Sequence, residues 1–374
     1  MLLGGQGVIS FIRDALEAWR GSGAHSVTVP PMDGALRPNQ TIEEAPALLS
    51  IESPDNLVTI GERVVFSSAG SVLGVAFNSE SASATPIEQF DQPVTALAGH
   101  PSGALAVALE DGRILIHGGG HSGKRLTEVG GRKIVCPTAL QFRDADTLVV
   151  ALGSQQNSPG RWKRDLMQRN ASGSVWRIDL VQGAASCLAD NLAFPYGLHI
   201  EADGGVIVSE SWRNQLLRVA EGRAPEQRLV DITGFPARLS AASFGGAWLS
   251  VFAPRSQLVE FVLRERDFCN DMMAEIEPEY WIAPTISAVN SFLEPLQGGA
   301  LKHLGILKPW APTRSYGLVV RLDSQYEPRA SFHSRADGRR HGITSCLEVG
   351  GRLIATSKGG DVIVSLPLPE MKRS

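Results

Sequence analysis

A unit of two short strands joined by a tight turn recurs along most of the chain and limits the folds open to it. Its clearest copy is residues 191–219, in which Asp203-Gly204-Gly205 marks a turn between two strand-forming runs. The run from Val206 to Val208 is apolar throughout, so we expect it to be buried on both faces. Further copies begin near residues 54, 94, 136, 235 and 341.

Each copy consists of a leading loop, an inner strand, a polar or glycine turn, and a second apolar strand. The copies start roughly 40 residues apart, with one longer interval between the fifth and the sixth. Repeats of about 40–50 residues with four strands each are typical of β-propeller blades. The sequence therefore predicts an all-β chain that folds as a six-bladed β-propeller. An array of unrelated β-sandwiches is the alternative, because the copies are degenerate.

The chain divides into two parts that differ in residue pattern. The first is residues 1–47, and the second is the predicted propeller at residues 48–374. Residues 7–20 place their apolar side chains on one face, which predicts a helix that packs on the propeller. A helix lying on a membrane surface is the alternative for this segment. Residues 21–47 are rich in Gly and Pro and are predicted to form an extended arm.

Two polar insertions interrupt the repeat, at about residues 155–171 in the third copy and about 266–312 in the fifth. The first is expected to be partly helical, and residues 267–277 and 284–304 of the second are each expected to form a helix. The fifth copy, residues 235–252, is expected to continue into the apolar run 256–263. Long loops on a rigid scaffold commonly carry function, so both insertions are expected to roof one end of the propeller.

Charge and composition exclude several classes of partner. The net charge is −4 and no basic block occurs, which argues against nucleic acid. No apolar run reaches the about 18 residues of a membrane span. The four cysteines lack CxxC spacing, so we expect thiols rather than disulfides or a zinc site. Arg13, Asp14 and Glu17 interrupt the apolar start of the chain, so we expect no signal peptide and a cytoplasmic location, with a removed export signal as the alternative. The sequence does not indicate an oligomeric state.

Three segments carry a family resemblance: FPYGLHIEADGGVIVSES, GFPARLSAASFGGAWLSV, and SYGLVVRLD followed by HGITSCLEVGGRLIATS. They resemble the strictosidine synthase-like group of six-bladed propellers, whose superfamily also holds the gluconolactonase/senescence marker proteins and the paraoxonases. The resemblance covers about residues 48–368. It implies a functional site at the hub, where the leading loops of the blades converge, but it does not specify the reaction, because one fold hosts several chemistries.

In the lactonase and esterase branches of that superfamily, acidic and amide side chains of the leading loops bind calcium. Here Asp55 keeps an oxygen donor, Thr138 stands at the third-blade position, and Tyr196 replaces an Asn. Ala237 and Arg238 replace an Asp-Asn pair, and a cation at that place would repel calcium. We therefore expect no calcium and no other cofactor. The acid/base Glu of the plant synthase corresponds to about Thr344, so amine–aldehyde condensation is not expected either.

The hub residues left by this comparison are expected to converge from different blades: Asp55, Thr138, Tyr196, Arg238, Arg340 and His341, with Trp162 of the first insertion above them. His341 is expected to act as acid or base, with Asp55 as its partner and Tyr196 facing an oxyanion. Arg238 suits a carboxylate or phosphate, and Thr138, Arg340 and Trp162 are expected to complete the substrate-binding surface.

The leading hypothesis is a hydrolase- or lyase-like enzyme that acts on a small anionic metabolite at the hub without a metal. One alternative is a propeller that binds a metabolite or a protein without catalysis. Another is a calcium-dependent lactonase or esterase. At the level of the residues, the alternative is that Arg238 and Asp55 form only a structural ion pair that plugs the hub, with Tyr196 packed over it.

Overall fold

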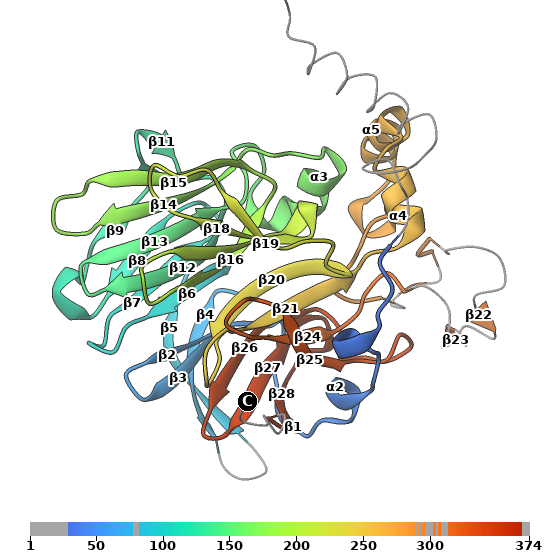
Figure 1. Ribbon diagram of the computed structural model, residues 1–374, viewed down its shortest axis with the longest axis horizontal. Coiled ribbons are helices and arrows are strands. Elements are labelled where there is room, and N and C mark those ends of the chain that lie inside the picture. The colour runs from blue at the N-terminus through green and yellow to red at the C-terminus, as the bar shows by residue number, and fades with distance from the viewer. Residues whose placement is uncertain are drawn as a thin grey trace, which may run out of the picture.

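The computed structural model describes residues 29–77, 82–288, 291, 293–295 and 313–368, together with the backbone of 302–303 and 306–307. Six antiparallel four-stranded sheets surround a common centre (Figure 1). The innermost strand of each sheet contacts the innermost strands of both neighbouring sheets, so that the ring is closed. The predicted six-bladed β-propeller is thereby confirmed.

All six innermost strands lie at the six copies of the sequence unit. From the centre outward, the first three blades are β2 (Pro54–Ile60), β3 (Arg63–Ser68), β4 (Ser71–Phe77) and β5 (Ala82–Gln89); β6 (Val94–Gly99), β7 (Leu105–Leu109), β8 (Ile114–His117) and β9 (Arg125–Leu126); and β12 (Pro137–Asp144), β13 (Thr147–Leu152), β14 (Gly173–Asp179) and β15 (Ala185–Leu192).

The other three blades follow the same order. They are β16 (Pro195–Ile200), β17 (Val206–Glu210), β18 (Gln215–Val219) and β19 (Glu226–Leu229); β20 (Gly234–Ala241), β21 (Ala247–Pro254), β24 (Leu318–Leu322) and β25 (Pro328–His333); and β26 (Ile343–Val349), β27 (Arg352–Ser357), β28 (Val362–Leu366) and β1 (Ala47–Ser50). The short hairpins β10 (Glu128–Val129) with β11 (Arg132–Lys133), and β22 (Lys302–His303) with β23 (Ile306–Leu307), lie outside the blades.

The last blade takes its outer strand from the beginning of the propeller. β1 pairs antiparallel with β28, so the two ends of the propeller chain meet in one sheet. Leu48 of β1 is 5% exposed and packs in one cluster with Ile363 of β28. This pairing closes the ring and covers an otherwise open strand edge.

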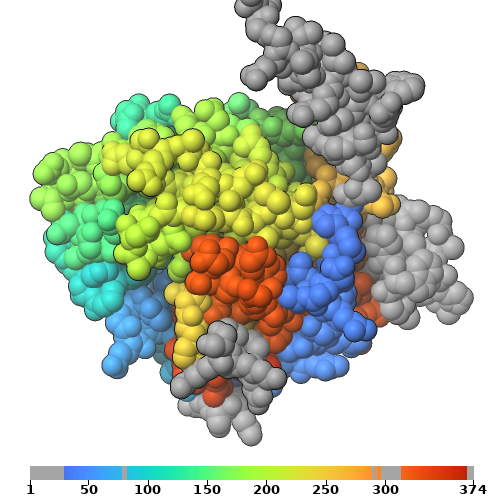
Figure 2. Space-filling view, viewed as in Figure 1, coloured from blue at the N-terminus to red at the C-terminus, as the bar shows by residue number. Residues whose placement is uncertain are grey.

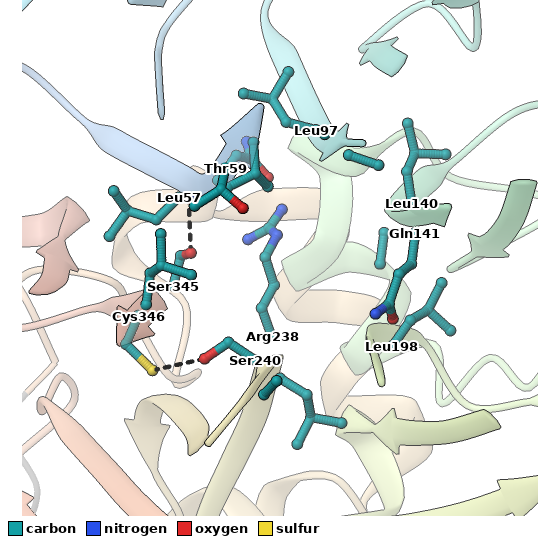
Figure 3. A pocket seen from close by; sticks show the side chains of 18 of the residues that line it. Leu57, Thr59, Leu97, Leu140, Gln141, Leu198, Arg238, Ser240, Ser345 and Cys346 are labelled. Carbon is teal, nitrogen blue, oxygen red and sulfur yellow. Dashed lines mark hydrogen bonds between the residues drawn. The ribbon is translucent and has the colours of Figure 1, made fainter. Parts of the chain in front are cut away.

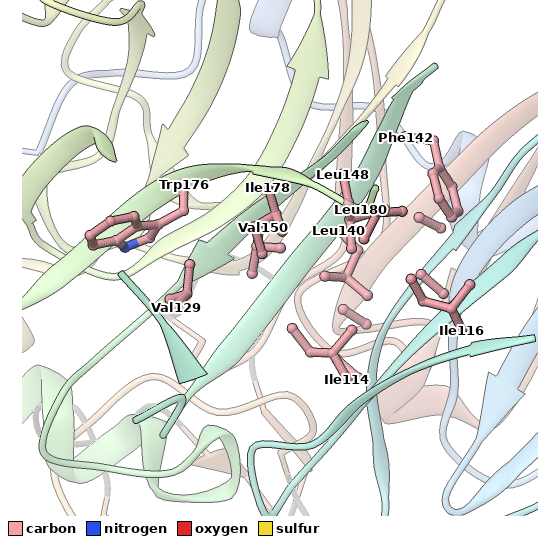
Figure 4. Close-up of a cluster of buried hydrophobic side chains, with 14 of the residues drawn as sticks. Ile114, Ile116, Val129, Leu140, Phe142, Leu148, Val150, Trp176, Ile178 and Leu180 are labelled. Carbon is pink, nitrogen blue, oxygen red and sulfur yellow. The ribbon is translucent and has the colours of Figure 1, made fainter. Parts of the chain in front are cut away.

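The second strand of each blade is apolar on both faces because the blades pack face to face. All five residues of β7 and all five of β17 are buried, which confirms the prediction for Val206 to Val208. Between the second and third blades, side chains such as Ile114, Leu140, Val150 and Trp176 form one cluster (Figure 4). The core is therefore a series of layers between neighbouring blades.

Residues 29–46 form an arm on the outside of the last two blades (Figure 2). It contains a short 3-10 turn, Gly34–Leu36, and the helix α2 (Thr41–Glu44). The side chain of Asn39 donates to the carbonyl of Ser331 at 2.9 Å and accepts from the amide of His333 at 3.0 Å. The helix predicted at residues 7–20 lies outside the described residues.

The first insertion is helical, as expected, and contains α3 (Trp162–Met167) after a 3-10 turn, Pro159–Arg161. In the second, α5 (Arg266–Glu275) lies close to the helix expected at 267–277. The expected helix at 284–304 is wrong, because the described residues of that range form none, and Pro284 and Pro295 remove backbone donors there.

The run 256–263, expected to continue the fifth blade, is also helical. It contains α4 (Gln257–Val262), because the hydroxyl of Ser256 accepts from the amide of Val259 at 3.3 Å and caps the helix. The third strand of that blade is β24, after the insertion. Within the part of the chain that the structure describes, no helix is long and apolar enough to cross a membrane.

Candidate functional site

Three of the predicted site residues occupy the same position in their leading loops, and this position brings their side chains to one end of the propeller. Asp55, Thr138 and Tyr196 each directly follow a proline at the start of an innermost strand. Because the blades repeat around one axis, residues at the same strand position meet at the same end of the ring. Lys358 arrives at this end from another direction, directly after β27. Asp55, Thr138, Tyr196 and Lys358 all line one cavity.

Asp55 is the centre of a buried ion cluster. It is 3% exposed, and its carboxylate lies 2.8 Å from Nη1 of Arg238 and 3.0 Å from Nζ of Lys358. The Thr344 hydroxyl and the Asn56 amide also donate to it, each at 2.8 Å. Burial alone would raise the pKa of Asp55, but Arg238 and Lys358 outweigh it and lower the pKa. Asp55 therefore stays ionised and is surrounded by four donors.

The guanidinium of Arg238 contacts several groups at the hub. Besides Asp55, its guanidinium donates through Nη2 to the carbonyls of Thr95 at 2.6 Å and Thr138 at 3.3 Å. Its Cζ atom lies 4.8 Å from the centre of the Tyr196 ring, a cation–π distance. These contacts match the structural ion pair that the sequence left as an alternative. A ligand anion would have to displace one of these partners to engage Arg238.

The glycine after Tyr196 allows this arrangement. A Cβ atom on Gly197 would lie 2.4 Å from the carbonyl oxygen of Ala237 and 2.8 Å from Cα of Arg238. Only glycine permits the innermost strands β16 and β20 to approach so closely. The pair Tyr196-Gly197 therefore places the ring beside the guanidinium by local backbone geometry.

Below the ion cluster, a narrow channel of about 180 Å³ runs between the innermost strands. Figure 3 shows Arg238 pointing into the middle of it, with Leu57, Leu97 and Leu140 among the surrounding side chains. Asp55 and Lys358 line the cavity at the other side of the cluster. The ion cluster thus separates the channel from the cavity.

The structure does not bring His341 and Arg340 to the cavity, contrary to the expected pairing of His341 with Asp55. The two ring nitrogens of His341 lie 2.6 Å from Oγ of Ser315 and 2.7 Å from the carbonyl oxygen of Arg335. Arg340 donates to the carbonyls of Ile42 at 2.9 Å and of Ala45. These residues hold a loop and the N-terminal arm in place, because their polar atoms are engaged there.

A neighbouring histidine makes stability depend on pH. His333 is fully buried between the Tyr316 hydroxyl, 3.1 Å away, and the Ser331 hydroxyl, 2.8 Å away. Burial lowers its pKa to about 4, whereas an unfolded histidine has a pKa near 6.5. Below about pH 6.5 the unfolded chain binds the proton and the folded chain does not, so stability falls as the pH drops.

We therefore expect a change from pH 7 to pH 5 to lower the free energy of unfolding by about 2 kcal/mol through His333. Urea unfolding at both pH values measures this, and His333→Gln is the control that lacks the titrating ring. The interpretation is wrong if the wild type and His333→Gln lose the same amount of stability between pH 7 and pH 5.

The cavity above the ion cluster, called the hub cavity below, has a volume of about 490 Å³. Its floor is polar, with the Lys358 side chain 29% exposed and the Thr95 hydroxyl buried without a partner among the described residues. Its walls are aromatic, formed by Phe194, Tyr196, Trp212, Phe252 and Trp162. An apolar cavity with a few polar groups at one end is typical of a small-molecule site.

The aromatic walls are packed in defined geometry. The rings of Phe194 and Trp212 stack with centres 4.4 Å apart, and Trp162 meets Phe252 edge to face at 5.4 Å. The indole nitrogen of Trp212 donates to Asp165 at 2.9 Å. Trp162 thus lies where it was expected, at the wall of the hub cavity, brought there by the first insertion.

Sequence reasoning missed Lys358, Trp212 and Glu110, which also line the hub cavity. Each directly follows, or lies two residues after, the second strand of a blade: β7, β17 or β27. Second strands run antiparallel to innermost strands, so they end where the leading loops begin. The residues after each second strand were therefore the signal that could have identified them.

The hub side chains do not fit a calcium ion. Calcium requires six to eight oxygen ligands. Two carboxylates in the described part of the chain line the hub cavity, and both are already engaged: Asp55 has two side-chain cations within 3.0 Å, and Glu110 accepts from the backbone amide of Gly160 at 2.8 Å. Among the described residues, no group of three or more His, Cys, Asp or Glu side chains is arranged to hold a metal.

Comparison with known proteins supports the fold. No family model and no curated protein matches the chain. A putative gluconolactonase of known structure is similar at a TM-score of 0.52 and 13% identity, over 87% of this chain and 91% of that one. A gluconolactonase from Xanthomonas campestris is similar at a TM-score of 0.51 and 14% identity, over 87% of this chain and 89% of that one. The chain thus has the six-bladed β-propeller fold that these gluconolactonases also adopt.

Proposed function

We propose that the chain acts on a small molecule that places a flat, apolar group in the hub cavity and an oxygen, of a carbonyl or carboxylate, at Lys358, without a metal. The observation that carries this proposal is the pairing of aromatic walls with the partly exposed side chain of Lys358 at the floor. Aromatic side chains favour a planar ligand, and the buried floor strengthens a charged hydrogen bond.

Lys358 is suited to hold negative charge rather than to remove a proton. Burial alone lowers the pKa of its amine, but the carboxylate of Asp55 more than offsets this and raises it. The amine therefore stays protonated at neutral pH. It can bind a carboxylate or stabilise the oxyanion that develops when a carbonyl is attacked.

Hydrolysis of an ester or lactone is the first reaction to test, because the similar structures are described as gluconolactonases. Binding without turnover is the second candidate. It is favoured by Asp55, whose carboxylate is ionised and engaged by four donors and therefore suits charge balance more than proton transfer.

Lys358→Met tests the proposal with 2-naphthoate as the probe. We expect this variant to bind the probe about 10- to 100-fold more weakly by calorimetry, because it loses a charged hydrogen bond of about 1.5–3 kcal/mol. Lys133→Met is the matched control, because Lys133 is exposed and distant from Lys358 in the sequence, and it should bind the probe like the wild type. Unchanged affinity in Lys358→Met would exclude Lys358 as the anchor.

Chelation tests the metal-free part of the proposal. Treatment with EDTA should leave probe binding, and any hydrolysis of naphthyl esters or aromatic lactones, within error of the untreated protein. Loss on chelation and recovery with calcium would show that the reaction depends on calcium after all.

A further inference from the structure

A second chamber of about 500 Å³ adjoins the hub cavity. Trp162 of α3 and Ile286 of the second insertion line both spaces, so these side chains form the wall between them. The second chamber is formed by the two insertions together, with Lys163 on one side and Thr285 on the other. Its lining holds more charged and hydroxyl side chains than that of the aromatic hub cavity beside it.

Thr285 carries an unused hydroxyl at this chamber. The residue is 5% exposed, and its Oγ1 atom has no hydrogen-bond partner among the described residues. Leaving a buried hydroxyl unpaired costs about 1–3 kcal/mol. A ligand oxygen in the chamber would relieve this cost, which the fold alone does not explain.

Lys163 supplies a cation that is only weakly engaged. Its ammonium donates to the carbonyl of Pro278 at a long 3.4 Å and lies 5.8 Å from the centre of the Trp162 ring. Burial and the nearby Arg314 lower the pKa of Lys163 to about 8, although the carboxylates of Glu279 and Glu294 act in the opposite direction, so the charge is only partly compensated. An anion beside it would offset this loss.

The other charged groups at the chamber are already engaged or lie at its rim. Arg314 donates to the carbonyls of Trp281 at 2.9 Å and Glu279 at 3.1 Å, and its Nη1 atom lies 3.6 Å from the carboxylate of Glu294. Glu279 is an exposed residue. Lys163 is therefore the cation left for an incoming anion.

We propose that the second chamber binds an anionic oxygen group on the same ligand whose flat part occupies the hub cavity. This inference rests on the proposed function and extends it to a substrate class: an aromatic acid, ester or lactone with a second, negatively charged group on a short chain. The chain passes beside Trp162, the anion pairs with Lys163, and the Thr285 hydroxyl donates to it.

The test is calorimetry with 2-naphthoate and with 2-naphthoates that carry a carboxyalkoxy tail of increasing length. We expect one tail length to bind about tenfold more tightly than 2-naphthoate, and a phosphonate tail of that length to gain similarly. The matching carboxamide tail, which lacks the charge, should gain nothing. Lys163→Met should abolish the gain from the charged tail and leave binding of 2-naphthoate itself unchanged, and Thr285→Val should reduce the gain.

The outcomes separate the two proposals. If 2-naphthoate binds but no charged tail strengthens binding, or if the gain survives in Lys163→Met, the second chamber is not an anion site and the hub proposal stands. If neither 2-naphthoate nor any tailed probe binds, both proposals are wrong.

Discussion

Replacing Arg238 with methionine is expected to lower the free energy of unfolding by about 3–5 kcal/mol. The variant would leave the buried carboxylate of Asp55 with Lys358 as its only cation within 3.0 Å among the described residues. The carbonyls of Thr95 and Thr138 would also lose a donor. Removing one member of a buried ion pair strands the other, which is why the effect is large. Urea unfolding at pH 7 measures it.

A surface pair provides the matched control for this experiment. Arg329 is 58% exposed and lies 2.5 Å from Asp323. Because water screens exposed pairs, Arg329→Met should cost at most about 1 kcal/mol. The double variant Asp55→Leu/Arg238→Met should recover part of the stability lost in Arg238→Met, since no buried carboxylate then lacks its arginine, although Lys358 loses its carboxylate partner. Equal losses in the two arginine variants would show that the buried ion pair at the hub contributes no more to stability than an exposed pair.

The same ion cluster also predicts how the stability of the protein changes as the pH falls. The folded pKa of Asp55 is lowered, so its contribution to stability is present above the unfolded pKa of about 3.9 and is lost as the pH falls through the folded value. Without Arg238, burial is opposed by Lys358 and Thr344 alone, so the pKa of Asp55 rises relative to the wild type. Arg238→Met should therefore lose stability at a higher pH than the wild type does.

The fold was predictable from the sequence because its signals are local and repeated. Each innermost strand begins in a similar loop, often at a proline, and each second strand is an apolar run such as Val206 to Val208. An error in the predicted structure of one segment does not change the fold that the repeats predict together. The run 256–263 has apolar residues that suit either a strand or a helix, and the cap formed by Ser256 decided for the helix.

The site was predictable only where a residue holds the same position in each repeat. Asp55, Thr138 and Tyr196 meet at the hub for that reason. Lys358 and Trp212 come from the ends of second strands, so their place depends on how two strands are paired. His341 precedes an innermost strand, but a hydrogen bond to Ser315 turns its ring to another partner. Strand pairings and hydrogen-bond partners of this kind cannot be predicted from the order of residues in the chain.

Asp165 links the first insertion to the hub cavity, and its loss is expected to affect both. It is fully buried and accepts from the side chains of Asn157 and Asn170, each at 3.0 Å, and from the indole of Trp212 at 2.9 Å. Asp165→Ala would leave the indole of Trp212 without its acceptor, whereas the side-chain amides of Asn157 and Asn170 keep Gln168 as an acceptor at 2.9 and 3.2 Å. One donor left unpaired and two lost hydrogen bonds to a carboxylate together predict a loss of about 3 kcal/mol in urea unfolding.

The same variant should weaken binding of 2-naphthoate, because Trp212 would lose the hydrogen bond that fixes its ring against Phe194. Asp165→Asn is the conservative control, since it keeps an oxygen for Trp212 but turns an amide donor toward both asparagines, which donate to the other oxygen. We expect it to lie between the wild type and Asp165→Ala in both stability and affinity. If Asp165→Ala loses stability but binds the probe as tightly as the wild type, the carboxylate only anchors the insertion. Loss of both together would show that the insertion positions the aromatic wall on which the proposed binding depends.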